Sequence, residues 1–161
     1  MTPNQTLWPT TILTITLALA GCGSDDSPDV SLSDDNYEII EQSSASYDDI
    51  TFAAFGAGSQ LRVLTSQEEY EDLLAELPDS PTANTIDFDS SRVIFAYTGS
   101  TPNSCYGIGL NSITATDHGL AVNLLRSSSS DSSCSQVLTA SWLLVQIDTG
   151  SSDLITFTER W

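Results

Sequence analysis

The stretch from residue 92 to residue 110 constrains the fold of this chain more than any other segment. It opens with five consecutive apolar residues, 93–97. A polar loop, 98–104, follows, and beyond Cys105 apolar side chains return at every second position. A short apolar run is typical of a fully buried strand, whereas alternation is typical of a half-buried one. The segment therefore predicts two strands at the centre of a β-rich domain.

One amphipathic helix and a series of short strands complete the predicted domain. The helix begins with a capping box, in which Thr65 precedes Glu68 by three residues. Ser66 with Glu69 is the alternative register. Apolar residues then recur at helical spacing until Pro78 ends the helix. Further strands are predicted over residues 50–55, 61–64, 86–88, 112–116, 120–124, 137–145 and 154–161, with a hairpin turn at 117–119. This order predicts a single small α+β domain, β-rich, with a mostly antiparallel sheet.

The charge of the chain excludes one class of partner. Its 161 residues carry a formal net charge of -18, with no Lys and four Arg. Such a chain is repelled by phosphate backbones, so nucleic acid is not expected as a partner. We interpret the acidic residues as a means of keeping the protein soluble. A saline habitat is one possible setting, because salt screens the repulsion between like charges.

The N-terminal segment resembles a bacterial lipoprotein signal. Residues 11–20 form an apolar run too short to span a bilayer, and the sequence Leu-Ala-Gly-Cys ends at Cys22. Residues 1–21 are therefore predicted to be a signal peptide, and Cys22 to carry several acyl chains that anchor the protein permanently. Gly23, rather than Asp, follows the acylated Cys. That resemblance implies the outer membrane of the cell envelope, with the periplasmic or surface face left open.

A tether is predicted between the anchor and the domain. Residues 22–47 are rich in Ser and Asp, with one weak apolar patch at residues 37–40. Such a composition buries too little apolar surface to offset the entropy of ordering. We expect a disordered acidic spacer here and the folded domain over residues 48–161. The paired Asp residues of the spacer lack calcium-loop spacing, so they are interpreted as solvated charges.

Two cysteines lie outside the leader. Cys105 and Cys134 form one pair, and an exported protein folds in an oxidising compartment. A disulfide between them closes a loop that stabilises by roughly 3–4 kcal/mol through chain entropy. A metal pair is the alternative, but no further ligands accompany it. We therefore predict a disulfide bond and no metal.

The order of features over residues 60–158 resembles the C-terminal domain of the PrcB family, lipoproteins associated with the stability of a surface protease complex. The similarity lies in RVLTSQEEYEDLL (62–74), IDFDSSRVIFAYTGSTPNSCYGIGLNSI (86–113), GLAVNLL (119–125) and ASWLLVQID (140–148). The family's Gly-rich turn is replaced by a turn that keeps Tyr106 but carries Ser104 and Cys105 in place of the glycines. The resemblance implies a partner-contact loop at Thr101, Pro102, Asn103, Ser104 and Tyr106.

No catalytic site is predicted. His118 is the only histidine and lies in an Asp-His-Gly turn, where a solvated turn residue is expected rather than a base. Asp87 and Asp89, two residues apart on a predicted strand, lack a partner group for acid-base chemistry. The sequence contains no set of metal ligands and no Gly-rich phosphate loop. We therefore predict a non-enzyme without a cofactor.

The predicted function is that of an anchored binding protein. The exported domain is expected to bind or stabilise another envelope protein, of which a protease is one candidate. The loops 98–104 and 127–133, brought together by the disulfide, are the predicted contact loops. Two alternatives are left open. The first is a protease inhibitor, because the turn 101–106 loosely resembles that of chagasin-type inhibitors. The second is a structural envelope lipoprotein without a dedicated partner.

Overall fold

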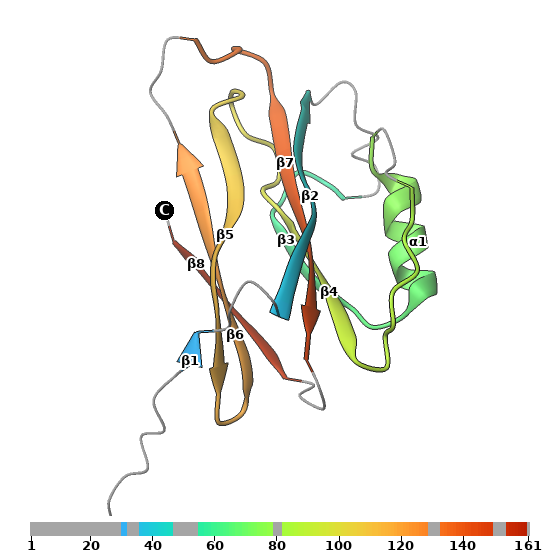
Figure 1. The fold of residues 1–161 in the computed structure, drawn as a ribbon. Helices are drawn as coiled ribbons and strands as arrows, with labels where there is room; N and C mark the ends of the chain where they lie inside the picture. Colours follow the sequence, from blue (N-terminus) through green and yellow to red (C-terminus); the bar gives the residue numbers. More distant parts are fainter. Residues whose placement is uncertain are drawn as a thin grey trace, which may run out of the picture.

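The described part of the chain folds into two four-stranded sheets and one helix (Figure 1). The computed structural model describes residues 30–31, 36–46, 55–78, 82–128, 133–149 and 154–160. The first sheet, called the β5 sheet, has the order β1 (Val30–Ser31), β5 (Tyr106–Thr116), β6 (Gly119–Ser128) and β8 (Ile155–Arg160). The second, the β7 sheet, has the order β2 (Tyr37–Ser46), β7 (Thr139–Asp148), β4 (Ser91–Tyr97) and β3 (Gln60–Leu64). Helix α1 spans Gln67–Glu76.

The predicted fold class is confirmed. The strand pairs are antiparallel, apart from β6 with β8, which run parallel. The β5 sheet covers one face of the β7 sheet, and α1 covers the other (Figure 1). The domain is therefore a β-rich α+β structure of three layers, with the β7 sheet in the middle.

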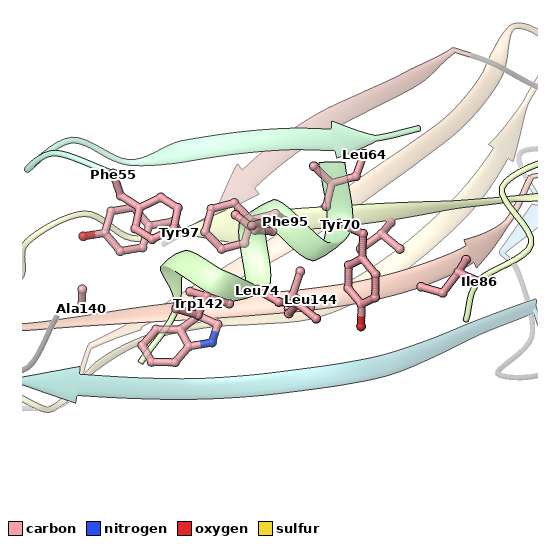
Figure 2. Packing of buried hydrophobic residues seen from close by; sticks show 13 residues of the cluster. Phe55, Leu64, Tyr70, Leu74, Ile86, Phe95, Tyr97, Ala140, Trp142 and Leu144 are labelled. Atoms are coloured by element: carbon pink, nitrogen blue, oxygen red, sulfur yellow. The ribbon is translucent and has the colours of Figure 1, made fainter. Parts of the chain in front are cut away.

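The middle position of β4 and β7 explains their continuous apolar runs. Alternate side chains of a strand point to opposite faces. Phe95 of β4 and Trp142 of β7 pack under α1 (Figure 2), whereas their neighbours Ile94 and Leu143 pack against the β5 sheet. All four side chains are almost fully buried. Both strands thus have two buried faces, as the apolar run 93–97 predicts.

Helix α1 begins in the second of the two predicted registers. Ser66 is the N-cap, and its hydroxyl accepts a hydrogen bond from the N–H of Glu69 at 3.2 Å. The Glu69 carboxylate accepts in turn from the N–H of Thr65 at 2.7 Å. Leu77 is the C-cap and precedes Pro78, which cannot continue the helix. The apolar face is buried as predicted: Tyr70, Leu73 and Leu74 lie against the β7 sheet.

The prediction of a disordered tether up to residue 47 is wrong for residues 37–46. These residues form strand β2, which pairs with β7 along its length. Two of its side chains, Ile40 and Ala45, pack against the core under α1, and Tyr37 packs against the core between the sheets. The hydrogen bonds of the ladder with β7 stabilise this strand, although its sequence has few apolar residues and does not by itself predict a strand. The remaining residues of the proposed tether, apart from β1 and Asn36, lie outside the described residues.

Of two further predicted strands, one is not formed and the other lies mostly outside the described residues. Residues 86–88 form a loop and turn before β4 instead of a strand. The Asp87 carboxylate holds this turn, because it accepts from the N–H of Asp89 at 3.1 Å and from the Ser90 hydroxyl at 2.9 Å. The strand predicted at residues 50–55 lies outside the described residues except for Phe55, which is buried under α1.

The hairpin turn at 117–118 is confirmed and joins β5 to β6. Gly119, which follows it, has a φ of 143°. A Cβ placed on Gly119 would lie 2.0 Å from the Leu154 carbonyl oxygen. The same carbonyl accepts from the N–H of Leu120 at 2.9 Å, just before β8 begins. Gly119 therefore lets the last strand approach β6 closely enough to pair with it.

Candidate functional site

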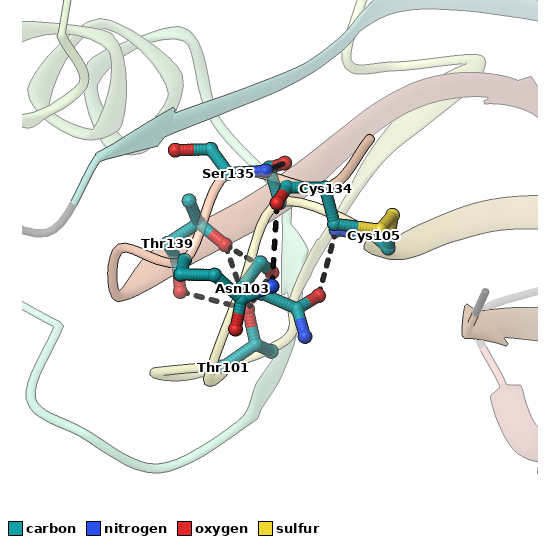
Figure 3. The surroundings of a disulfide bond; sticks show 8 residues. Thr101, Asn103, Cys105, Cys134, Ser135 and Thr139 are labelled. Carbon is teal, nitrogen blue, oxygen red and sulfur yellow. Dashed lines mark hydrogen bonds between the residues drawn. A yellow bond between two sulfur atoms is a disulfide. The ribbon is translucent and has the colours of Figure 1, made fainter. Parts of the chain in front are cut away.

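A disulfide between Cys105 and Cys134 closes one end of the sandwich (Figure 3). The two Cα atoms are 5.4 Å apart, as a disulfide requires. Cys105 directly precedes β5, and Cys134 lies in the loop that leads to β7. The predicted pairing is confirmed, and the bridge attaches the loop after β4 to the loop before β7.

A hydrogen-bonded pair of threonines holds the same two loops together. Thr101 and Thr139 exchange backbone hydrogen bonds of 2.8 and 3.0 Å, and their hydroxyl oxygens are 2.9 Å apart. The Thr139 hydroxyl also donates to the Asn103 carbonyl at 2.6 Å, and the Asn103 side chain accepts from the N–H of Cys105 at 2.9 Å (Figure 3). The loop 98–105 is therefore fixed by main-chain, side-chain and covalent links.

The predicted contact loop is only partly exposed. Pro102 and Ser104 are exposed, and Asn103 and Tyr106 are half-buried. Thr101, however, is buried at 7 % exposure, with its hydroxyl bonded to Thr139. Thr101 therefore supports the loop from within, and the predicted residues that are exposed to a partner are Pro102 and Ser104. Partner contact through this loop stays a prediction.

An exposed apolar pair flanks this loop. Val137 and Leu138 are 48 % and 51 % exposed and directly precede Thr139. The Thr101–Thr139 bridge places Leu138 beside Pro102, since these residues neighbour the two ends of the bridge. We call Pro102, Ser104, Val137 and Leu138 the disulfide tip. Of the second predicted contact loop, 127–133, the structure describes Ser127, Ser128 and Ser133; the other residues lie outside the described part.

An ion pair formed by a buried arginine connects the start of the tip loop to β8. Arg126 of β6 is 7 % exposed and donates to the Thr98 carbonyl at 3.2 Å, where the tip loop begins. It also donates to the Glu159 carboxylate of β8 at 2.8 Å. The guanidinium thus links the start of the loop, which follows β4 of the β7 sheet, to edge strand β8 of the β5 sheet.

A polar groove opens beside the tip. It has a volume of about 510 Å³ and lies between β2 and β7 of one sheet and β5 and β6 of the other. Its lining consists of Gln42, Ser43, Ser44, Ser104, Cys105, Tyr106, Gly107, Ile108, Ser127 and Ser141. Sequence reasoning missed the wall formed by residues 42–44, because it placed them in the tether. The sequence signal that was available there is the weak apolar patch at residues 37–40, whose aromatic and β-branched side chains favour a strand.

The tip and the groove lie far from the end where the N-terminal segment enters the domain. Strand β1 pairs with Thr114 and Ala115, next to the hairpin turn at the other end of β5. At about 3.3 Å per residue, the span from Cys105 to Ala115 is roughly 30 Å. The lipidation candidate Cys22 lies outside the described residues, upstream of β1.

The described residues contain no arrangement that resembles a catalytic centre. His118 is exposed in the hairpin turn, at the opposite end of β5 from the groove. No group of three or more His, Cys, Asp or Glu that could hold a metal ion occurs in the described part of the chain. Within that part, moreover, no helix has the length and apolar character needed to cross a bilayer.

Comparison with protein-family models, with curated proteins and with solved structures finds no match. The resemblance to the PrcB family therefore stays a prediction that rests on the sequence segments quoted above.

Proposed function

We propose that this protein is a lipid-anchored envelope protein whose folded domain binds and stabilises another exported protein through the disulfide tip. The lipobox-like sequence ending at Cys22 supports the anchor. The disulfide supports export, because such bonds persist in oxidising compartments. A protease is one such partner, as the resemblance to the PrcB family implies.

The observation that carries this proposal is the position and character of the tip. It lies roughly 30 Å from the strand nearest the anchored segment, measured along β5. A domain tethered at one end therefore presents its other end away from the membrane. That end exposes Val137 and Leu138 on a chain with a net charge of -18. Exposed apolar side chains on a rigid support are typical of protein–protein contacts.

The inhibitor alternative receives less support. An inhibitory loop enters an active-site cleft with its turn residues exposed. Here Thr101 is buried, and Asn103 and Tyr106 are only half-exposed. A contact that stabilises a partner does not require a loop that enters a cleft, because it can form on the surface of the tip.

The test compares two exposed leucines at opposite ends of the domain. Leu138 at the tip is 51 % exposed, and Leu154 near the start of β8 is 54 % exposed. Tagged protein is captured from membranes in mild detergent, and the co-purifying exported protein is quantified by mass spectrometry. We expect Leu138→Ser to reduce capture about tenfold or more. Leu154→Ser, the matched control, should leave it unchanged.

Two further readouts separate the proposal from its alternatives. Cys22→Ser should move the protein from the membrane fraction to the soluble fraction. If the captured partner is a protease, its turnover should persist in the complex, whereas an inhibitor would abolish it. Capture that is absent, or equally sensitive to both leucine substitutions, would contradict the proposal and favour a structural envelope protein.

A further inference from the structure

The two sheets leave a seam between strands β2 and β5. Both strands lie at the side of the sandwich where the two sheets meet. In the described part of the chain, no hydrogen-bonded ladder joins them: β2 pairs with β7, and β5 pairs with β6 and, at residues 114–115, with β1. Among the described residues, the segment 106–112 of β5 thus has a strand on one side only. The polar groove follows this seam.

Main-chain groups of β5 point into the seam. The carbonyl of Ile108 accepts from the Gln42 side chain of β2 at 3.0 Å, and the carbonyl of Tyr106 accepts from the Ser141 hydroxyl of β7 at 3.0 Å. In an antiparallel ladder, the N–H and C=O of one residue point to the same side. The N–H groups of Tyr106 and Ile108 therefore also face the seam. Flexible side chains, instead of a neighbouring strand, cover this edge.

The lining of the seam suits a polypeptide backbone. None of its ten residues is charged, although the chain carries 22 acidic residues. Gly107 and Gly109 alternate along β5, and glycine in a strand allows another backbone to approach closely. Hydroxyl groups such as those of Ser44 and Ser127 both donate and accept hydrogen bonds, so they can bond to either the N–H or the C=O of a peptide main chain.

The same edge of β5 already accepts a strand. Val30 and Ser31 of β1 pair antiparallel with Ala115 and Thr114. A second extended segment in line with β1 would continue this row toward Cys105. Because the chain is strongly acidic, an acidic segment would be repelled, whereas a neutral or basic one would not.

We propose that the seam binds an extended, neutral or basic peptide segment of the exported partner, which pairs antiparallel with residues 106–110 of β5. This inference rests on the proposed function, since it names how the partner is held. The incoming backbone takes over the carbonyls that Gln42 and Ser141 now cover and bonds the N–H groups of Tyr106 and Ile108. Main-chain pairing of this kind gives affinity, and the adjacent side chains select the sequence.

The test uses a probe that does not require the native partner. A phage-displayed library of random 12-residue peptides is selected on the folded, disulfide-bonded protein. Enriched peptides are then synthesised, and their affinities are measured on three variants. Ser44→Trp and Ser127→Trp fill the seam from opposite walls at exposed positions. Thr158→Trp, exposed on edge strand β8, is the matched control.

We expect neutral or basic peptides whose affinity falls about tenfold or more for both seam variants and stays unchanged for the control. Hydrogen exchange should slow at residues 106–110 on peptide binding and not at the hairpin 114–120. The inference would be overturned if no peptide is enriched, or if peptide affinities are the same for the wild type and both seam variants. Two other results would also overturn it: a dimer that Ser44→Trp disrupts, and peptidoglycan fragments that compete for the seam in place of peptides.

The two proposals fail separately. Loss of capture by Leu138→Ser together with no peptide binding in the seam would leave the proposed function standing and remove the seam. Peptide binding in the seam without any captured partner would remove the proposed function and leave the seam as a peptide-binding edge whose ligand is not an exported partner.

Discussion

Among the residues that the structure describes, Glu41 is a carboxylate whose surroundings disfavour its charge. It lies on β2 beside the core under α1, where one oxygen accepts from the Trp142 indole N–H at 3.2 Å. The other oxygen is buried with no hydrogen-bond partner among the described residues. Burial raises the pKa of Glu41, and the bond from Trp142 opposes this rise. Burial, together with the charge of Glu41, also raises the pKa of Tyr70.

Replacing Glu41 by Gln should stabilise the protein at neutral pH. Because its folded-state pKa lies above the unfolded one, protonation favours the fold, and the penalty from the charged form appears as the pH rises through the folded-state pKa. Gln keeps the acceptor for Trp142 and removes the charge. We expect a gain of roughly 0.5 kcal/mol at pH 7, small because solvent screens the half-buried site, and no gain below the unfolded pKa.

Urea unfolding between pH 4 and pH 8 measures this difference. Glu38→Gln, an exposed position on the same strand, serves as the control and should change stability little. A Glu41→Gln variant less stable than the wild type at neutral pH would show that the charge is held by a partner.

At the scale of elements, helix α1 depends on its first turn. The Ser66 hydroxyl bonds the N–H of Glu69, and the Glu69 carboxylate bonds both the N–H and the hydroxyl of Thr65. The two bonds from Thr65, first the one from its N–H, hold the pKa of Glu69 below its usual value. Their contribution is therefore present above the unfolded pKa and is lost as the pH falls through the folded one.

Ser66→Ala should destabilise the protein by about 1 kcal/mol, because the N–H of Glu69 loses its acceptor at the helix start. Thermal unfolding at fixed pH measures the loss. Thr85→Ala, exposed in the loop after the helix, is the control and should have no comparable effect. An equal effect of the two substitutions would argue against Ser66 as the cap.

Strand β2 shows how an element depends on its neighbours. Its sequence, YEIIEQSSAS, contains few apolar residues, and isolated strands are not stable. Pairing with β7 satisfies its backbone on one side, while Ile40 and Ala45 reach the core under α1. As an edge strand it needs only that side paired, which is why polar side chains are tolerated on it.

At the scale of the whole molecule, the disulfide connects segments 29 residues apart. Replacing both Cys105 and Cys134 by Ser should lower the free energy of unfolding by roughly 3 kcal/mol, because the unfolded chain regains loop entropy. Chemical denaturation measures the loss, and adding a reductant to the wild type should reproduce it. A fully reduced wild type as stable as the oxidised protein would contradict a structural role for the bond.

Local patterns in the sequence were enough to predict the elements at the centre of the fold. The run 93–97 predicts a strand buried on both faces, and the spacing of apolar residues after Ser66 predicts the apolar face of α1. The Asp-His-Gly turn predicts the β5–β6 hairpin. Each of these signals depends on residues a few positions apart, whose side chains share a face because of the strand or helix period. The pairing of Cys105 with Cys134 follows because they are the two cysteines outside the predicted leader.

Only the tertiary structure shows that β2 belongs to the β7 sheet, that Thr101 is buried and that a seam lies between β2 and β5. Each depends on contacts between distant segments: Gln42 with the Ile108 carbonyl, 66 residues apart, and Thr101 with Thr139, 38 residues apart. A polar edge strand and a buried threonine carry no local signature, because their hydrogen bonds are completed by other parts of the chain. The sequence by itself therefore determined the central strands β4, β5 and β6, the helix and the bridge. The packing of the two sheets determined the place of β2 and which surfaces remain open.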